Sequence, residues 1–184
     1  MANFIVKAFR YRTLKKLPNL NRRKYTSLGD AKNIAFVFNS QEKDIAEAIE
    51  LLKARLKGAN ISYRGFGISF TKDESTNTKL DHDPYIVQIL KKETNWLSIP
   101  QIEQAENFYK GEYDILLDLS LDHSFAIEYS LKRCTSNMVV GFCPEREYLY
   151  DICITDKDGE INPNTSVVEY VKHAIQYLTI IKSK

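Results

Sequence analysis

Short apolar segments alternate along the chain with longer segments in which apolar residues recur every three or four positions. Six short segments are rich in apolar or β-forming residues and predict strands, at Asn33–Phe38, Asn60–Phe70, Tyr85–Leu90, Asp114–Leu119, Met138–Phe142 and Leu149–Thr155. The first and the fourth are almost continuously apolar, which is typical of parallel strands covered on both faces. We therefore expect the sheet to lie inside the molecule.

The segments between these strands have helical periodicity. They predict four helices, at Gln41–Lys57, Pro100–Lys110, Asp122–Cys134 and Ser166–Lys182. Asn39 and Ser40 offer N-cap oxygens for the first of these helices. Ser166 and Glu169 have the spacing of a capping box at the start of the last one. Polar, turn-rich sequence predicts an exposed loop at 71–83 and a turn at 156–159.

Strands that alternate with helices predict an α/β fold, a three-layer sandwich with a mostly parallel open sheet that is Rossmann- or flavodoxin-like. We expect this single domain to occupy residues 27–184. Residues 1–26 differ in composition and are expected to form a basic N-terminal arm. Within the second strand, Gly65 and Gly67 indicate a β-bulge, because glycine weakens a regular strand.

Charge is divided unevenly between the arm and the domain. The first 29 residues contain no Asp or Glu and carry eight basic residues, Lys7, Arg10, Arg12, Lys15, Lys16, Arg22, Arg23 and Lys24. The whole chain has 26 basic and 24 acidic residues, so the remainder has 18 against 24 and a formal charge of −6. A clustered positive field attracts polyanions, which indicates nucleic acid or an anionic surface as the partner.

Aromatic residues are interleaved with these cations, in Arg10–Arg12 (RYR) and Arg22–Tyr25 (RRKY). Cations suit phosphates and aromatic rings suit stacking on bases, so RNA is the expected partner. On a helix of about 100° per residue, Phe4, Ile5 and Val6 point in three directions and the cations scatter. An interfacial membrane helix needs separate apolar and basic faces, so that alternative is weaker. A tail that only confers solubility stays open.

A second candidate site follows the strand at Asp114–Leu119. In doubly wound sheets, ligands bind beyond the carboxyl ends of the strands, where the strand order reverses. Five polar residues lie there within seven positions, Asp118, Ser120, Asp122, His123 and Ser124. A histidine beside two carboxylates can act as a base or bind a metal. Alternatively, Asp122 or Ser120 caps the following helix and His123 lies exposed in its first turn.

Other chemistry has no signature in the sequence. The turn after Phe38 lacks the glycines of a dinucleotide-binding or P-loop phosphate site. Cys134, Cys143 and Cys153 have neither paired nor zinc-ligand spacing, so we expect buried thiols in a reducing cytoplasm, with no metal and no cofactor. No segment approaches the roughly 20 apolar residues of a membrane span.

Several short motifs are shared with one protein family. Asn95–Pro100 reads NWLSIP and Tyr113–Leu119 reads YDILLDL, after a basic N-terminal helix and a strand–helix opening. With Val140–Phe142, Leu149–Asp151 and Tyr177–Ile181, the chain resembles a family of small uncharacterised α/β proteins from Bacteroidota. The resemblance spans most of the chain. It implies a bacterial cytoplasmic protein and no known activity or catalytic residues.

A narrower likeness, over residues 113–142, is to heptosyltransferase-type glycosyltransferases. The shared features are a YD-apolar-Asp strand, a helix and a short strand that ends in glycine. The chain is about half as long as a two-domain enzyme of that type, so the likeness implies sheet architecture and not function.

Three functions therefore stay open. The first is a non-enzymatic RNA-associated protein, on ribosomes or in their assembly, that binds through the basic arm. The second is a small nucleotide- or nucleotide-sugar-binding, enzyme-like domain that uses the Asp118–Ser124 crevice. The third is a peripheral membrane or protein-complex adaptor. We expect the first, because the charge is polarised and no catalytic signature is present.

Overall fold

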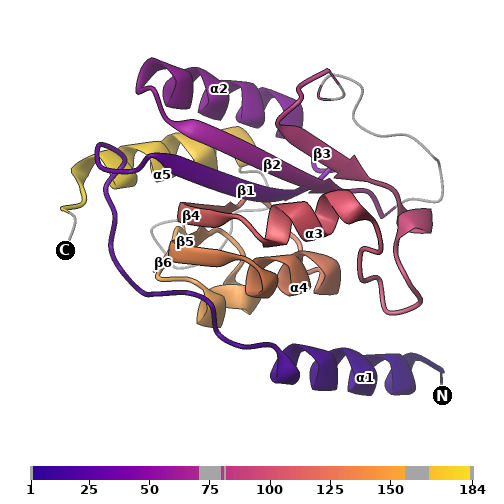
Figure 1. The fold of residues 1–184 in the computed structure, drawn as a ribbon. Helices are drawn as coiled ribbons and strands as arrows, with labels where there is room; N and C mark the ends of the chain where they lie inside the picture. The colour runs from indigo at the N-terminus through magenta and orange to yellow at the C-terminus, as the bar shows by residue number, and fades with distance from the viewer. Residues whose placement is uncertain (1, 71–79, 81, 156–165, 183–184) are drawn as a thin grey trace.

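The computed structural model describes residues 2–70, 80, 82–155 and 166–182 (Figure 1). Within them, six strands form one sheet, β1 Asn33–Asn39, β2 Ser62–Ile68, β3 Ile86–Ile89, β4 Glu112–Asp118, β5 Thr135–Gly141 and β6 Ile152–Cys153. The α-helices are α1 Ala2–Lys16, α2 Ile45–Gly58, α3 Glu103–Tyr109, α4 Phe125–Arg133 and α5 Val167–Ile180. Two 3₁₀ helices are η1 Lys91–Glu93 and η2 Pro144–Leu149. Most of the loop expected at 71–83, and the turn expected at 156–159, lie outside the described residues.

The strands lie in the order β3-β2-β1-β4-β5-β6, and every neighbouring pair is parallel. β1 pairs with β2 over its whole length, from Asn33 opposite Ser62 to Asn39 opposite Ile68. The chain moves outward from β1 in one direction and then from β4 in the other, so the strand order reverses between these two strands. The expected α/β fold with an open parallel sheet is confirmed.

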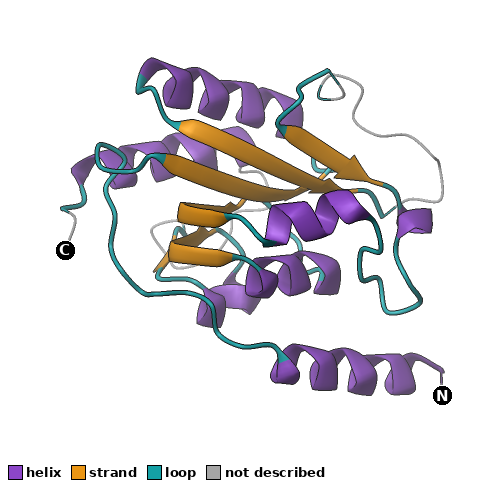
Figure 2. Ribbon diagram, viewed as in Figure 1, coloured by secondary structure: helices purple, strands orange, loops and turns teal. Residues whose placement is uncertain are grey.

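Helices cover both faces of the sheet, so the molecule has three layers (Figures 1 and 2). On one face, α2 and α5 share an apolar core with Ile34, Phe36 and Phe38 of β1. On the other face, α3 and α4 share a second core with Ala35 and Val37. Alternate residues of β1 therefore point to opposite faces, and all five are buried, as the continuous apolar run predicts.

Helix α1 lies outside the sandwich, next to α4 (Figure 1). Val6, Leu14 and Leu17 are partly buried against the core on that side of the sheet. Val6 and Leu14 share one side of the helix, so α1 docks through a narrow stripe. The segment after α1 then joins the sheet, because the backbone N–H groups of Arg22 and Lys24 donate to carbonyl groups of β5, each at 2.8 Å.

Helix α2 begins at Ile45 rather than near Gln41. Its N-cap is Asp44, which has a φ of 62° and makes no side-chain capping bond. The caps expected at Asn39 and Ser40 are therefore wrong. The reason is that residues 40–44 form a loop, in which Gln41 and Glu42 bond to the segments that follow β2 and β4 before the helix starts.

The other helices and strands begin and end within a few residues of their predicted positions. Ser166 Oγ accepts the backbone N–H of Glu169 at 3.4 Å, which confirms this half of the capping box. Pro100 forms a β-bridge, so α3 begins only at Glu103. The sixth strand is shortened to Ile152–Cys153 at the edge of the sheet.

Gly65 and Gly67 lie in regular register opposite Phe36 and Phe38, so the predicted β-bulge is wrong. The two phenylalanine rings occupy the space that a side chain would need. A Cβ atom at Gly65 would lie 2.5 Å from Phe36 Cε2, and one at Gly67 would lie 2.5 Å from Phe38 Cζ. The glycines are thus needed for close packing rather than for an irregular backbone.

Candidate functional site

Side chains of the protein itself bridge the loops at the strand-order reversal between β1 and β4. Glu42 Oε1 accepts the backbone N–H of Leu121 at 2.9 Å and that of Asp122 at 3.4 Å. Gln41 bonds instead to the residue after β2, since its Nε2 donates to Ser69 Oγ at 2.5 Å. Internal hydrogen bonds therefore occupy these polar groups between the strand ends, where doubly wound folds hold ligands.

The bridging carboxyl group of Glu42 is partly desolvated. Burial raises the pKa of Glu42, and the nearby carboxylates of Asp122 and Asp118 act in the same direction, while the two backbone N–H donors oppose them. A phosphate group brought to this place would meet a carboxylate that already uses the N–H donors.

Asp118, the first residue of the predicted crevice, is fully buried and forms an ion pair with Arg146, which is also fully buried. Arg146 Nε lies 2.8 Å from Asp118 Oδ2. The same oxygen accepts the hydroxyl of Tyr150 at 2.6 Å, and Oδ1 accepts the backbone N–H of Ser120 at 2.9 Å. Both oxygens of the Asp118 carboxylate are therefore bonded within the protein.

The guanidinium of Arg146 also fixes the loop after β4. Its Nη1 donates to Asp122 O at 2.8 Å, and its Nη2 donates to Ser120 O at 3.0 Å. Burial lowers the pKa of Arg146, but the carboxylate of Asp118 more than offsets this, so the pKa lies above its ordinary value. Arg146 was not among the predicted site residues. It lies 28 positions after Asp118, and its one sequence signal is a position in the loop after another parallel strand.

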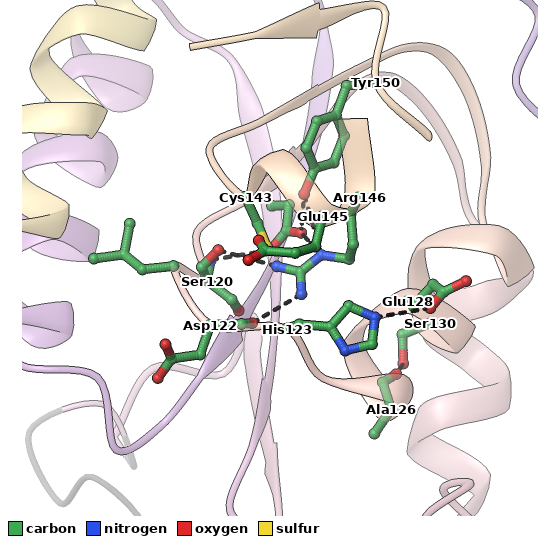
Figure 3. A network of polar contacts seen from close by, with 12 residues as sticks. Ser120, Asp122, His123, Ala126, Glu128, Ser130, Cys143, Glu145, Arg146 and Tyr150 are labelled. Carbon is green, nitrogen blue, oxygen red and sulfur yellow. Dashed lines mark hydrogen bonds and ion pairs between the residues drawn. The ribbon is translucent and has the colours of Figure 1, made fainter. Parts of the chain in front are cut away.

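Glu128, in the first turns of α4, is a second buried carboxylate at this edge of the sheet. His123 Nε2 lies 3.4 Å from Glu128 Oε2 (Figure 3), and the hydroxyl of Tyr148 donates to Glu128 Oε1. Burial and this hydrogen bond raise the pKa of Tyr148, so the hydroxyl stays protonated. The buried carboxylate thus orients two rings that reach the surface.

The predicted crevice is divided between the interior and the surface. Ser120 is buried, whereas Asp122 and His123 are exposed. The N-cap of α4 is Ser124, whose side chain makes no capping hydrogen bond. The alternative in which Asp122 or Ser120 caps α4 is therefore wrong, and His123 precedes the helix instead of lying in its first turn.

Arg10 is the arm cation that holds α1 on the domain. Its Nε donates to Leu97 O at 3.1 Å and its Nη2 donates to Ser98 Oγ at 2.8 Å. Its guanidinium carbon lies 5.0 Å from the centroid of the Phe125 ring. Partial burial lowers the pKa of Arg10. Arg22 is also engaged, in a surface ion pair of 2.9 Å with a glutamate of β4.

The other six arm cations are exposed. Within the part of the chain that the structure describes, none of them has an ion pair, and they are Lys7, Arg12, Lys15, Lys16, Arg23 and Lys24. Phe4, Phe9 and Tyr11 of α1 are 78%, 45% and 65% exposed. We define the outer face of α1 by its exposed cations and rings, Phe4, Lys7, Phe9, Tyr11, Arg12, Lys15 and Lys16.

A groove of about 760 Å³ lies between α1 and the start of α4, and we call it the α1–α4 groove. Its walls include Lys7, Arg10 and Tyr11 of α1, Asp122, His123 and Ser124 of the loop after β4, and Tyr148 of η2. Two sets of residues that were predicted as separate sites thus meet here. Asp118, Ser120 and the arm cations other than Lys7 and Arg10 do not line this groove.

Cys134 and Cys143 are buried, and Cys153 is partly buried. Burial raises the pKa of Cys143 to about 12, so its thiol is protonated at neutral pH. Among residues 2–70, 80, 82–155 and 166–182, no three His, Cys, Asp or Glu side chains gather as a metal-ligand set. The same stretches contain no helix of the length and apolarity needed to cross a membrane.

Comparison with known proteins identifies one family. Residues 3–181 match a family of unknown function (DUF6913), so the chain belongs to this family over nearly its whole length. No curated protein and no solved structure matches the chain. The resemblance to a family of small α/β proteins of unknown function is confirmed, and the expected bacterial group stays a prediction.

Proposed function

We propose that this member of the DUF6913 family is a non-enzymatic, cytoplasmic RNA-associated protein that binds through α1 and the segment after it. One observation carries the proposal. Six exposed cations lie within residues 7–24 and have no ion pair among the described residues. The chain after residue 29 has 18 basic and 24 acidic residues, so the excess positive charge belongs to this segment alone.

Unpaired cations are the ones that RNA can use. A Lys or Arg that binds a phosphate releases a condensed counterion, which favours binding at low salt. Arg10 and Arg22 already have partners in the protein, so six phosphate contacts are the upper limit for the arm. Six contacts with single-stranded RNA correspond to a slope of about −4 for log affinity against log salt.

The order of residues around α1 favours RNA over a lipid surface. At about 100° per residue, the exposed side runs in angular order through Lys7, Tyr11, Phe4, Lys15, Arg12, Ile5, Lys16 and Phe9. Rings and charges are therefore mixed, whereas a helix that lies in a membrane interface separates them. Mixed rings and cations suit bases and phosphates that alternate along a strand.

The crevice after β4 has less support as a ligand site. Asp118 is bonded to Arg146 and Tyr150, and Glu42 occupies the backbone donors of the neighbouring loop. A nucleotide that reached the buried part of the crevice, at Asp118 and Ser120, would have to displace these internal partners. We therefore assign no catalytic role to the residues at the carboxyl ends of β1 and β4.

RNA affinity across a range of salt concentrations tests the proposal. The unmodified protein is compared with a variant that combines Arg12→Gln, Lys15→Gln and Lys16→Gln on the outer face of α1. Losing three contacts should weaken binding and make the salt slope shallower by about 2. The charge-matched control combines Lys43→Gln, Arg55→Gln and Lys110→Gln, three exposed cations outside the arm, and should keep the slope of the unmodified protein.

An equal decrease in both triple variants would show a general charge effect and contradict the proposal. The same proteins are mixed with vesicles that contain an anionic lipid. If α1-dependent flotation replaces RNA binding, the arm serves a membrane surface and the RNA proposal fails.

A further inference from the structure

We infer that the α1–α4 groove holds one unpaired nucleotide of the RNA, so that the protein distinguishes single-stranded from double-stranded RNA. The inference rests on the proposed function and adds the form of the RNA and the place of one base. The groove has a volume of about 760 Å³. This lies within the range of about 300–1,000 Å³ that is usual for small-molecule sites.

Tyr148 presents an oriented aromatic surface to this groove. The residue is 61% exposed, yet its hydroxyl is bonded to the carboxylate of Glu128, which is buried. The hydrogen bond restricts the ring while its faces remain accessible. Stacking a base on a ring that is already oriented costs less side-chain entropy than stacking on a free one.

Lys7 and Tyr11 line the groove from α1 and lie one helical turn apart. Tyr11 is 65% exposed, and Lys7 is exposed with no ion pair among the described residues. A ring beside a cation matches a base beside its phosphate. Lys7 also belongs to the outer face of α1, so a strand that enters the groove continues along the other cations.

Hydrogen-bonding side chains complete the lining of the groove. Asn39, Ser98 and Asp122 line it together with His123, whose Nε2 lies 3.4 Å from the buried Glu128 carboxylate. These groups include both donors and acceptors, which are what the edge of an unpaired base requires.

Double-stranded RNA cannot use these groups. Inside a duplex, neighbouring bases cover both faces of each base, and its Watson–Crick edge is paired. A ring in the groove can therefore stack only on a base that has left the helix. A duplex still meets the outer-face cations through its phosphates, so the two forms of RNA should differ by the contribution of the groove alone.

The test uses the unmodified protein, a short single-stranded RNA and the same RNA paired with its complement. Tyr148→Leu should weaken single-strand binding by about tenfold or more, and leave duplex affinity and the salt slope unchanged. Tyr11→Leu should act in the same direction without disturbing a buried group. The matched control is Tyr177→Leu, a tyrosine of α5 that is 57% exposed, and it should change neither affinity.

A nucleoside 5′-monophosphate serves as a second probe, observed by NMR. It should shift the ring resonances of Tyr148 and His123 and leave those of Tyr177 in place. The inference would be overturned if the protein bound the two RNA forms with equal affinity, or if neither Tyr148→Leu nor Tyr11→Leu changed the affinity for single-stranded RNA. Salt-dependent binding through Arg12, Lys15 and Lys16 would then still support the proposed function. No RNA binding by the unmodified protein would overturn both.

Discussion

The carboxyl end of β4 and the outer face of α1 use charge in opposite ways. Asp118 and Arg146 are both fully buried, lie 2.8 Å apart and have further bonds to Tyr150 and to loop carbonyl groups. Lys15 and the other cations of the outer face are exposed, and no ion pair engages them within the described residues. The first region stabilises the fold, and the second is available to an external partner.

The difference shows that a polar residue at the expected place in a fold need not belong to a binding site. Asp118 ends a strand next to the strand-order reversal, where doubly wound proteins bind ligands. A buried charge requires an internal partner, and Arg146 supplies it. Exposed charges need no internal partner, because water solvates them. Burial therefore distinguishes Asp118 and Arg146, which are bonded within the protein, from the cations of the outer face of α1, which can bind an external partner.

The largest expected effect comes from breaking the buried pair. Arg146→Met leaves the Asp118 carboxylate buried without its cation and should lower the free energy of unfolding by about 3–5 kcal/mol, measured by urea denaturation. The control is Arg22→Met in the exposed ion pair of 2.9 Å, where the loss should be at most about 1 kcal/mol. Equal losses would remove the distinction between the two regions. Combining Arg146→Met with Asp118→Leu should be less harmful than Arg146→Met alone, because no charge stays unpaired.

A smaller effect is expected from moving Tyr150. A Cβ atom at Gly141 would collide with the Tyr150 ring, whose hydroxyl donates to Asp118. Gly141→Ala should therefore cost about 1–3 kcal/mol of stability, as overpacking usually does. Gly58→Ala is the control. No atom lies within 4 Å of the added Cβ in α2, so thermal stability should be unchanged or increased. Similar melting temperatures for the two variants would show that Tyr150 is free to move.

Arg10 combines features of the two regions, because it is a cation of α1 that is bonded within the protein. Arg10→Ala removes two hydrogen bonds and the contact with the Phe125 ring, and should weaken the docking of α1 by about 1–2 kcal/mol. Faster hydrogen exchange in α1, with little change in the sheet, would show this. Arg12→Ala changes an exposed cation of the same helix and should leave the exchange rates unaltered. Equal exchange in the two variants would mean that the apolar stripe alone docks α1.

The smallest effect concerns the pH dependence of stability. Burial raises the pKa of Glu42 above its ordinary value of 4.5, so between these two values the folded state binds more protons than the unfolded state. Stability should therefore fall as pH rises through this interval, and the cost of the ionised group persists above it. Glu42→Gln keeps the acceptor for Leu121 and Asp122, so it should be the more stable protein at neutral pH and lose the advantage below pH 4.5. A parallel pH profile for the two proteins would contradict this.

Local patterns predicted the fold well because strands and helices are periodic over a few residues. The apolar runs that became β1 and β4 are buried on both faces, and each lies within a residue or two of its predicted range. The prediction of a β-bulge at Gly65 and Gly67 was wrong because the role of these glycines is not local. Their role depends on the rings of Phe36 and Phe38 in a neighbouring strand, which no pattern within β2 can show.

The candidate sites divide in the same way. The concentration of cations is visible in the sequence, but the different roles of Arg10 and Arg12 are not, because helical projection does not say which side of α1 docks. Likewise, the polar run from Asp118 to His123 contains no sign that Arg146 pairs with its first member. The α1–α4 groove could not be predicted at all, since it joins segments more than 100 positions apart.

Taken alone, the sequence of this protein determined the alternation of strands and helices, the burial of the parallel sheet and the basic character of residues 7–24. These are properties of neighbouring residues, and backbone geometry and side-chain chemistry act on them locally. Only the tertiary structure decided which charges are neutralised inside and which stay exposed. That outcome depends on the desolvation of each group and on partners that the fold brings within hydrogen-bonding distance.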